Sequence, residues 1–86
     1  MILGLYSIKD KLTEFQGTMA IQDDKVALRI FEGYCKRQKA ENYTDSRYFE
    51  LYKLGEMNTD TGVINAYTKQ EIKLIGEGDQ YDEQRT

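Results

Sequence analysis

RYFELYKL, residues 47–54, is the stretch that decides the fold of this chain. Aromatic residues fit the pleated, half-buried surface of a sheet, so the density of tyrosine and phenylalanine here predicts a strand. Successive side chains of a strand point to opposite faces. The alternation predicts that one side carries Phe49 and Leu51 and the other Tyr48, Glu50, Tyr52 and Leu54. One face then belongs to the core, and the other is a half-exposed tyrosine surface.

On both sides of this strand the sequence predicts further strands. Turn-forming residues 58–62, NTDTG, precede the apolar run VINAY at 63–67, so the central strand and this run form a predicted β-hairpin. Two other short apolar runs, ILGLYSI at 2–8 and EIKLI at 71–75, are also predicted strands. The segment 12–21, LTEFQGTMAI, is interrupted by a glycine and is compatible with either an irregular strand or an extended loop.

One helix is predicted over residues 24–38. Asp23 or Asp24 offers an N-cap, since a short carboxylate accepts hydrogen bonds from the first helical N–H groups and suits the positive end of the helix dipole. One helical face is apolar and is expected to turn towards the sheet, with Ile30 and Phe31 in the core. That face consists of Ala27, Ile30, Phe31, Tyr34 and Cys35. The predicted fold class is therefore α+β, with one amphipathic helix packed on a small, mainly antiparallel β-sheet of three to five strands.

The length of 86 residues allows one hydrophobic core and predicts a single domain. Residues 1–75 are expected to form this α+β domain. From residue 76 the composition changes to Gly, Asp, Glu and Gln, which bury too little apolar surface to stay ordered alone. Residues 76–86 are therefore predicted to be an acidic, disordered and dispensable C-terminal tail.

Histidine is absent and Cys35 is the single cysteine, which limits the chemistry of the chain. Zinc sites, histidine acid–base catalysis and Ser–His or Cys–His nucleophile pairs depend on the missing side chains. We therefore expect no catalytic residue, no metal site and no cofactor, and we do not expect an enzyme. A lone cysteine allows no intrachain disulfide, and no apolar stretch reaches the ~20 residues of a membrane span. These features favour a cytoplasmic protein with no membrane partner.

Charge is balanced in the expected folded part, because residues 1–75 carry eleven basic and eleven acidic side chains. A protein-wide field that attracts nucleic acid is thus not predicted. A local patch is conceivable where the helix ends and the tyrosine-rich strand begins, because cations beside aromatic faces hold single-stranded nucleic acid. The candidate nucleic-acid-binding residues are Arg29, Lys36, Arg37, Lys39, Arg47, Tyr48 and Tyr52. Alternatively, the two tyrosines pack on the sheet or at a dimer contact, and the cations only solvate the helix end.

The order of three motifs resembles that of a known phage family. The motifs are LYSIKD at 5–10, DDKVALRIF at 23–31 and RYFELYKLGEMNTDTGVI at 47–64. They resemble the small nonstructural protein of gokushoviruses, single-stranded DNA phages of the Microviridae, whose members carry Tyr-Ser-x-x-Asp and later Tyr-x-Leu-Tyr-x-Leu-Gly-x-aromatic. In this chain Phe49 replaces the first tyrosine of the second motif, and Met57 stands in place of its final aromatic residue.

This resemblance implies a noncatalytic accessory protein of the phage, located in the cytoplasm of the bacterial host. Such proteins are described as DNA-binding and are proposed to act when replication shifts from duplex copying to single-strand synthesis and packaging. Our leading hypothesis is therefore binding of single-stranded DNA during replication or packaging. The alternative is a protein-binding module, either a homodimer or a ligand of a host or capsid protein, that uses an exposed sheet edge or the tyrosine face and has no nucleic-acid role.

Overall fold

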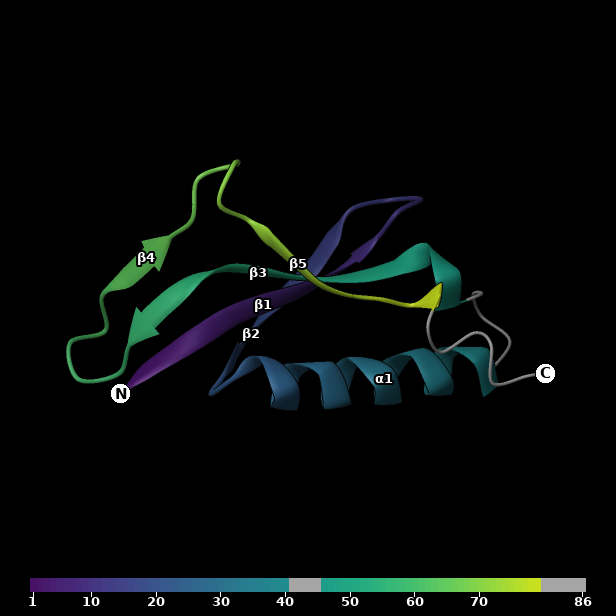
Figure 1. Ribbon diagram of the computed structural model, residues 1–86, viewed down its shortest axis with the longest axis horizontal. Coiled ribbons are helices and arrows are strands. Elements are labelled where there is room, and N and C mark those ends of the chain that lie inside the picture. Colours follow the sequence, from purple (N-terminus) through teal and green to yellow (C-terminus); the bar gives the residue numbers. More distant parts are fainter. Residues whose placement is uncertain (41–45, 80–86) are drawn as a thin grey trace.

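The computed structural model describes residues 1–40 and 46–79 of the chain (Figure 1). Within these residues the structure has one α-helix and five strands, which confirms the expected α+β class. The elements in chain order are β1 (Ile2–Asp10), β2 (Phe15–Ile21), α1 (Asp24–Ala40), the short 3-10 helix η1 (Ser46–Tyr48), β3 (Phe49–Asn58), β4 (Ile64–Ala66) and β5 (Lys73–Glu77). The described helix α1 is not long and apolar enough to cross a membrane.

The strands form one antiparallel sheet in the order β2-β1-β3-β4, and β5 also pairs with β3. Strand β3 is the longest strand and is hydrogen-bonded to three others. Its outer edge is shared, because β4 pairs with Gly55–Met57 and β5 pairs with Glu50–Lys53. Figure 1 shows β4 and β5 following one another along β3, with α1 on one side of the sheet. The tyrosine-rich stretch therefore organises the sheet.

The predicted alternation along β3 is confirmed where the helix packs. Phe49 and Leu51 are buried in the core, whereas Glu50 and Tyr52 are only partly buried and contact each other through a hydrogen bond. The strand begins two residues later than expected, because residues 47 and 48 belong to η1. This 3-10 turn is held to the β1–β2 connection by a hydrogen bond from the Lys11 amide to the Tyr48 carbonyl, 2.8 Å long.

Helix α1 begins where the sequence predicts and contributes one stripe to the core. The Asp23 carboxylate accepts a hydrogen bond from the Val26 amide at 2.9 Å, which is the expected N-cap. The core cluster contains Tyr6, Ile8, Ile21, Ala27, Phe31, Cys35, Phe49 and Leu51. The prediction for Phe31 is confirmed, but the one for Ile30 is wrong, because its side chain is 43% exposed. Consecutive helical residues are about 100° apart, so a face centred on Phe31 leaves Ile30 on the flank.

The segment 12–21, for which the sequence allowed either a strand or a loop, contains strand β2, which carries a β-bulge. The register runs from Gly4 opposite Ile21 to Ser7 opposite Thr18 and then shifts, so that Lys9 stands opposite Phe15. The buried Ser7 hydroxyl donates to the Gln16 carbonyl at 2.8 Å within this irregular part. A bulge reverses the side-chain alternation. Met19 and Ile21 consequently pack on the helix side, whereas Phe15 contacts Tyr52 on the other face.

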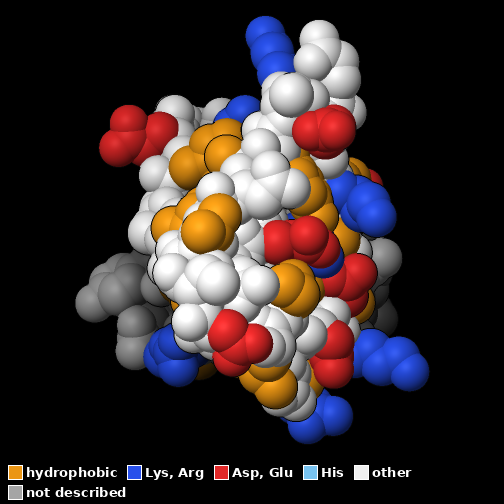
Figure 2. All heavy atoms as spheres, turned by 90° about the vertical axis from the view of Figure 1, so that its left-hand side faces the viewer, with side chains coloured by type: hydrophobic (Ala, Val, Ile, Leu, Met, Phe, Trp, Pro, Cys, Tyr) orange, Lys and Arg blue, Asp and Glu red, His pale blue; other side chains and the backbone are white. Residues whose placement is uncertain are grey.

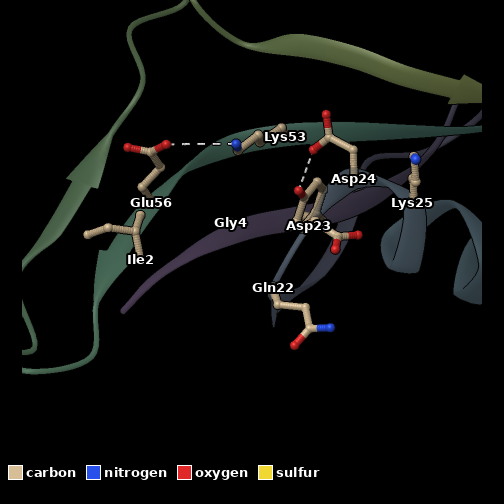
Figure 3. Close-up of a pocket in the computed structure, with 9 residues that line it drawn as sticks. Ile2, Gly4, Gln22, Asp23, Asp24, Lys25, Lys53 and Glu56 are labelled. Carbon is tan, nitrogen blue, oxygen red and sulfur yellow. Dashed lines mark hydrogen bonds and ion pairs between the residues drawn. The ribbon is translucent and has the colours of Figure 1, made fainter.

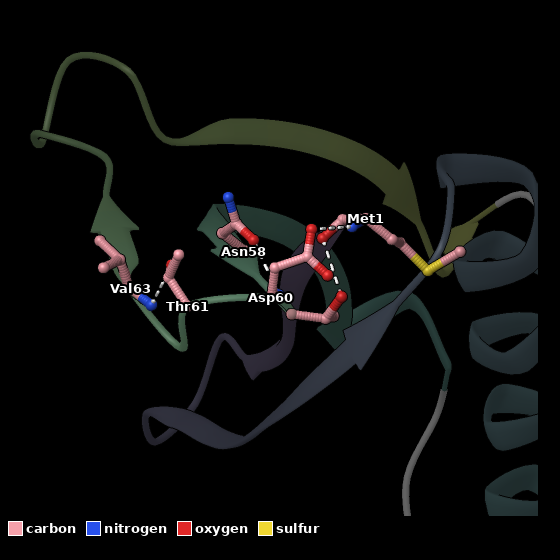
Figure 4. Close-up of polar contacts among 6 residues, drawn as sticks. Met1, Asn58, Asp60, Thr61 and Val63 are labelled. Carbon is pink, nitrogen blue, oxygen red and sulfur yellow. Dashed lines mark hydrogen bonds and ion pairs between the residues drawn. The ribbon is translucent and has the colours of Figure 1, made fainter.

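The β3–β4 connection is a turn fixed by its own polar residues (Figure 4). The Gly62 amide donates to the Asn58 carbonyl at 2.7 Å, and Gly62 has a φ of 78°, a left-handed conformation that favours glycine. The Asp60 amide donates to the Asn58 side chain at 2.8 Å. Asp60 also lies 3.5 Å from the α-amino group of Met1, so the turn is tied to the start of β1. The expected hairpin is confirmed.

The sheet continues beyond residue 75, where the sequence analysis placed the start of the tail. Gly76 belongs to β5 and is buried against the helix, since a Cβ atom at this position would lie 2.6 Å from Leu28 Cδ2 and 3.6 Å from Phe31 Cδ2. The Gly78 amide donates to the Phe49 carbonyl at 2.9 Å. Residues 76 and 77 therefore belong to the sheet and Gly78 is hydrogen-bonded to it, whereas residues 80–86 of the expected tail lie outside the described residues.

Replacing Phe31 with alanine should lower the free energy of unfolding by about 3–5 kcal/mol, because the fully buried ring leaves a cavity between helix and sheet. Ile30→Ala is the matched control and should change it by less than about 1 kcal/mol at low protein concentration, because its side chain is 43% exposed at the edge of the helix–sheet contact. Urea denaturation followed by circular dichroism measures both. Equal losses for the two variants would contradict the helix orientation described above.

Deleting residues 76–86 should lower the melting temperature markedly, because it removes the packing of Gly76 on the helix and the hydrogen bond of Gly78 to Phe49. Deleting only residues 80–86 should change the melting temperature little, because these residues are polar and contain few apolar side chains to bury. Calorimetry on the two truncations compares them directly. A folded 1–75 chain with unchanged stability would contradict the role assigned to the end of β5.

The Cys35 thiol should be inert in the native state at neutral pH. It is fully buried, and desolvation, with a smaller contribution from the charge of Glu32, raises its pKa to about 12. Because the folded pKa is raised, the stability gained from the neutral thiol is complete below about pH 9 and is lost as the pH rises towards 12. Iodoacetamide labelling measured by mass spectrometry should be slow in buffer and fast in urea. Equally fast labelling of the native protein would contradict burial of this thiol.

Candidate nucleic-acid interface

Helix α1 covers one face of the sheet, and no helix in the described part of the chain covers the opposite face (Figure 1). Large apolar side chains reach the surface on this open face. Phe15 is 39% exposed and Leu74 is 42% exposed, and Leu74 stands opposite the half-buried Tyr52 in the β3–β5 register. Exposed aromatic rings on an open sheet are able to stack on planar groups.

The centre of this surface is a pair of rings from two strands. Phe15 of β2 and Tyr52 of β3 pack edge to face, with centroids 5.5 Å apart and an interplanar angle of 70°. The Lys9 ammonium of β1 lies 5.4 Å from the centroid of the Phe15 ring. Together with Lys11 and Glu50 these residues form what we call the aromatic face. The β-bulge in β2 places Phe15 beside Tyr52, because in a strand without the bulge the Phe15 side chain would point to the helix side of the sheet.

Polar contacts hold Tyr52 in place and keep it neutral. Its hydroxyl donates to Glu50 Oε1 at 3.0 Å, and Glu50 Oε2 lies 3.8 Å from Lys11 Nζ. Burial raises the pKa of Tyr52 above its usual value, and the hydrogen bond to Glu50 and the charges of Glu50 and Glu77 raise it further. The phenol therefore presents a neutral ring at physiological pH. The arrangement offers rings for stacking and two nearby cations.

Two further predicted residues lie in the turn that leads into β3 and that also contacts α1. Arg47 and Tyr48 lie in η1, and the Arg47 guanidinium is 5.6 Å from the centroid of the Tyr48 ring. The hydrogen bond between Lys11 and Tyr48 links η1 to the end of β1. Arg47, Tyr48 and Tyr52 are thus arranged along one end of the sheet, beginning at η1 and continuing into β3.

The helix cations do not share a face with Tyr52. Arg29, Lys36 and Arg37 are exposed on α1, which packs on the opposite side of the sheet. Lys36 is paired with Glu32 at 2.8 Å, which reduces the net positive charge on that side. Lys39 lies in the same helix, near its C-terminal end. The seven predicted residues therefore fall into two groups, with the four helix cations separated from Tyr52 by the sheet.

Phe15, Lys9 and Lys11 were not among the residues predicted from the sequence. A strand with regular alternation would place Phe15 on the same face as Met19 and Ile21, which are core residues. Only the bulge moves it to the open face, and Gly17 is the one sequence signal of that bulge. The two lysines flank the expected end of β1, where cations usually indicate nothing more than a solvated strand end.

A separate cavity of about 600 Å³ lies between the N-terminal end of α1 and the sheet (Figure 3). Several of its polar side chains already have partners. Asp24 accepts a hydrogen bond from the buried Tyr6 hydroxyl, Glu56 lies 3.8 Å from Lys53, and Asp23 caps the helix. Burial raises the pKa of Tyr6, and the hydrogen bond to Asp24 adds to this effect. These contacts therefore serve to hold the start of α1 on the sheet.

The surface around this end of the molecule is not basic. Figure 2 views the molecule from the end that carries the N-terminus, where acidic and hydrophobic side chains share the middle and Lys and Arg lie towards the rim. The exposed apolar side chains there include Met1, Ile2, Val63 and Ile64. Among the residues that the structure describes, no group of three His, Cys, Asp or Glu side chains comes close enough to hold a metal ion. Among the described residues, this end thus shows neither a concentrated basic patch nor a cluster of metal-ligating side chains.

Comparison with known proteins identifies a family. The family model described as Phage ORF5 protein matches residues 3–81. No curated protein and no solved structure matches the chain. The phage origin implied by the sequence motifs is confirmed, whereas the gokushovirus assignment stays a prediction. Since the match covers nearly the whole chain, this protein belongs to the Phage ORF5 protein family.

Proposed function

We propose that this phage protein is a noncatalytic accessory protein that binds single-stranded DNA on its aromatic face. The observation that carries the proposal is the ring pair of Phe15 and Tyr52 on an open sheet, with the Lys9 ammonium 5.4 Å from the Phe15 centroid. Every base has a flat π-face, so exposed rings bind single strands with little sequence preference. Paired bases in a duplex are not free to stack in this way.

Cations around the rings supply contacts for the phosphates. Lys9 lies near the end of β1, Lys11 directly follows that strand, and Arg47 lies in the adjoining η1 turn. A strand stacked on Tyr52 and Phe15 would run past these cations at the end of the sheet. Glu50 and Glu77 lie near Tyr52 and oppose phosphate there, so we expect modest affinity that falls steeply with salt.

The proposed role follows from this binding mode and from the resemblance to gokushovirus nonstructural proteins. A protein that holds single strands without catalysing a reaction fits the stage at which duplex copying gives way to single-strand synthesis and packaging. The seven predicted residues provide two alternative surfaces for this role. One is the aromatic face with Arg47 and Tyr48, and the other is the outer side of α1. We favour the first, because the Lys9 ammonium lies over the Phe15 ring and Lys11 lies near the Glu50 carboxylate that binds Tyr52.

A protein-binding module is the alternative function, and one observation favours it. The expected folded part carries equal numbers of acidic and basic residues, so it has no excess positive charge that would draw it to DNA. A host or capsid protein that packs on the apolar part of the aromatic face would then replace the nucleic acid. The experiment below separates these functions.

Titration of fluorescently labelled oligothymidine with the full chain across a salt series tests the proposal. Tyr52→Leu and Phe15→Leu keep apolar volume but remove the ring, so each should weaken binding about 5- to 150-fold, equivalent to about 1–3 kcal/mol of lost stacking. The slope of affinity against salt should stay nearly unchanged, because no phosphate contact is removed.

A charge-matched pair of double variants distinguishes the two surfaces. Lys9→Gln with Lys11→Gln should weaken binding and reduce the salt slope by about 1.4, the amount expected for two phosphate contacts of a single strand. Lys36→Gln with Arg37→Gln removes the same charge from the helix side and should leave binding nearly unchanged. The reverse pattern would move the site to the helix. Absence of binding by the wild-type protein at low salt would refute DNA binding and leave the protein-binding function.

A further inference from the structure

Strand β2 is an outer strand of the sheet and is protected by neither charge nor proline, although it carries a bulge near its start. Its seven residues, FQGTMAI, include no charged residue and no proline, and five of them are exposed. Natural edge strands are normally protected by lysine, proline or a bulge, because their unpaired backbone groups recruit other strands. The bulge of β2 lies towards its start, and the register from Thr18 to Ile21 is regular. The edge is therefore able to pair with another strand.

The helix flank above this edge carries an exposed apolar side chain. Gln16 of β2 donates to the Tyr34 hydroxyl at 3.0 Å, which shows that the Tyr34 side of α1 faces β2. Ile30 lies one helical turn before Tyr34 on that side and is 43% exposed. Thr18 lies two residues, about 7 Å, along β2 from Gln16, and Ile30 lies four residues, about 6 Å, along α1 from Tyr34. Thr18 is therefore nearly level with Ile30.

Two exposed charged residues stand at equal sequence separations from Ile30. Asp23, the N-cap residue just before α1, precedes it by seven residues, and Arg37 in α1 follows it by seven, which is close to two helical turns. Both side chains are exposed. Two copies related by a two-fold axis near Ile30 would therefore place Asp23 of each opposite Arg37 of the other, with the isoleucines between them. Thr18 is likewise the middle residue of β2, so the same axis passes near the centre of the strand.

We propose that two copies of this chain dimerise through β2, which pairs antiparallel with β2 of the second copy about a two-fold axis near Thr18. Two five-stranded sheets then join into one sheet of ten strands. The helices lie side by side on one face of it, and the two open faces become one continuous surface. An uncharged strand suits this arrangement. Near the two-fold axis, a charged residue of β2 would lie opposite the same charged residue of the second copy, and like charges directly opposite each other destabilise a sheet. This dimer does not depend on the proposed binding of DNA.

A second copy accounts for the observations better than a peptide of another protein. A foreign strand would need only the free backbone of β2. The symmetric spacing of Asp23 and Arg37 about Ile30, together with the coincidence of Ile30 and the middle of β2, is expected only when the partner presents the same residues in reverse order.

Sedimentation equilibrium of the full chain over a range of concentrations tests the proposal. The wild-type protein should have twice the mass of one chain. Thr18→Lys and Ile30→Lys each place like charges across the axis, and each should raise the dimer dissociation constant by about tenfold or more. Gln70→Lys adds the same charge in the β4–β5 connection, away from β2, and should leave the dimer intact. Circular dichroism checks that the variants are folded. If Thr18→Lys is unfolded, the dissociation constant of Ile30→Lys tests the dimer instead.

Cross-linking tests the register. Thr18→Cys brings two thiols together at the axis, so mild oxidation should give an interchain disulfide, whereas Gln70→Cys should not. The native Cys35 is buried and should not take part. A monomeric wild-type protein at the highest concentration reached would overturn the proposal. So would a dimer that resists both lysine variants, or one in which the two cysteine variants cross-link equally.

Discussion

Within residues 1–40 and 46–79 one α-helix covers a sheet of five strands, and this constraint determines the rest of the described structure. Helix α1 buries the face formed by Tyr6, Ile8, Ile21, Phe49 and Leu51. The described residues form no second helical layer, and a sheet buried on one face leaves the other for solvent or a partner. The apolar and aromatic side chains that remain on the open face are the features that the fold itself does not use.

The sequence predicted those elements whose signals are local and mutually consistent. The aromatic alternation of β3, the Asp23 cap and the turn formers after Asn58 each act within a few residues, and each is found in the structure. The assignment of Ile30 to the core failed because a three- and four-residue spacing does not fix the width of the apolar helix face. Packing on the sheet fully buries only the stripe of Ala27, Phe31 and Cys35 within that face.

The candidate site was only half predictable, because it depends on pairing between distant segments. Tyr52 was found from its own strand, but its neighbour Phe15 reaches it only through a bulge whose position follows from the β1–β2 register. The end of the domain was misplaced for a similar reason. Gly76 resembles the start of a polar tail, yet the absence of a side chain is what allows β5 to approach Leu28 and Phe31.

The central claim, that the open sheet face is the functional surface, is tested most directly by nuclear magnetic resonance of the isotope-labelled chain titrated with oligothymidine. The account predicts that shift changes concentrate on Lys9, Phe15 and Tyr52, with smaller changes at Arg47 and Tyr48. Signals of Arg29 and Lys36 on the helix should stay in place. Changes confined to the helix, or no change at any DNA concentration, would contradict it.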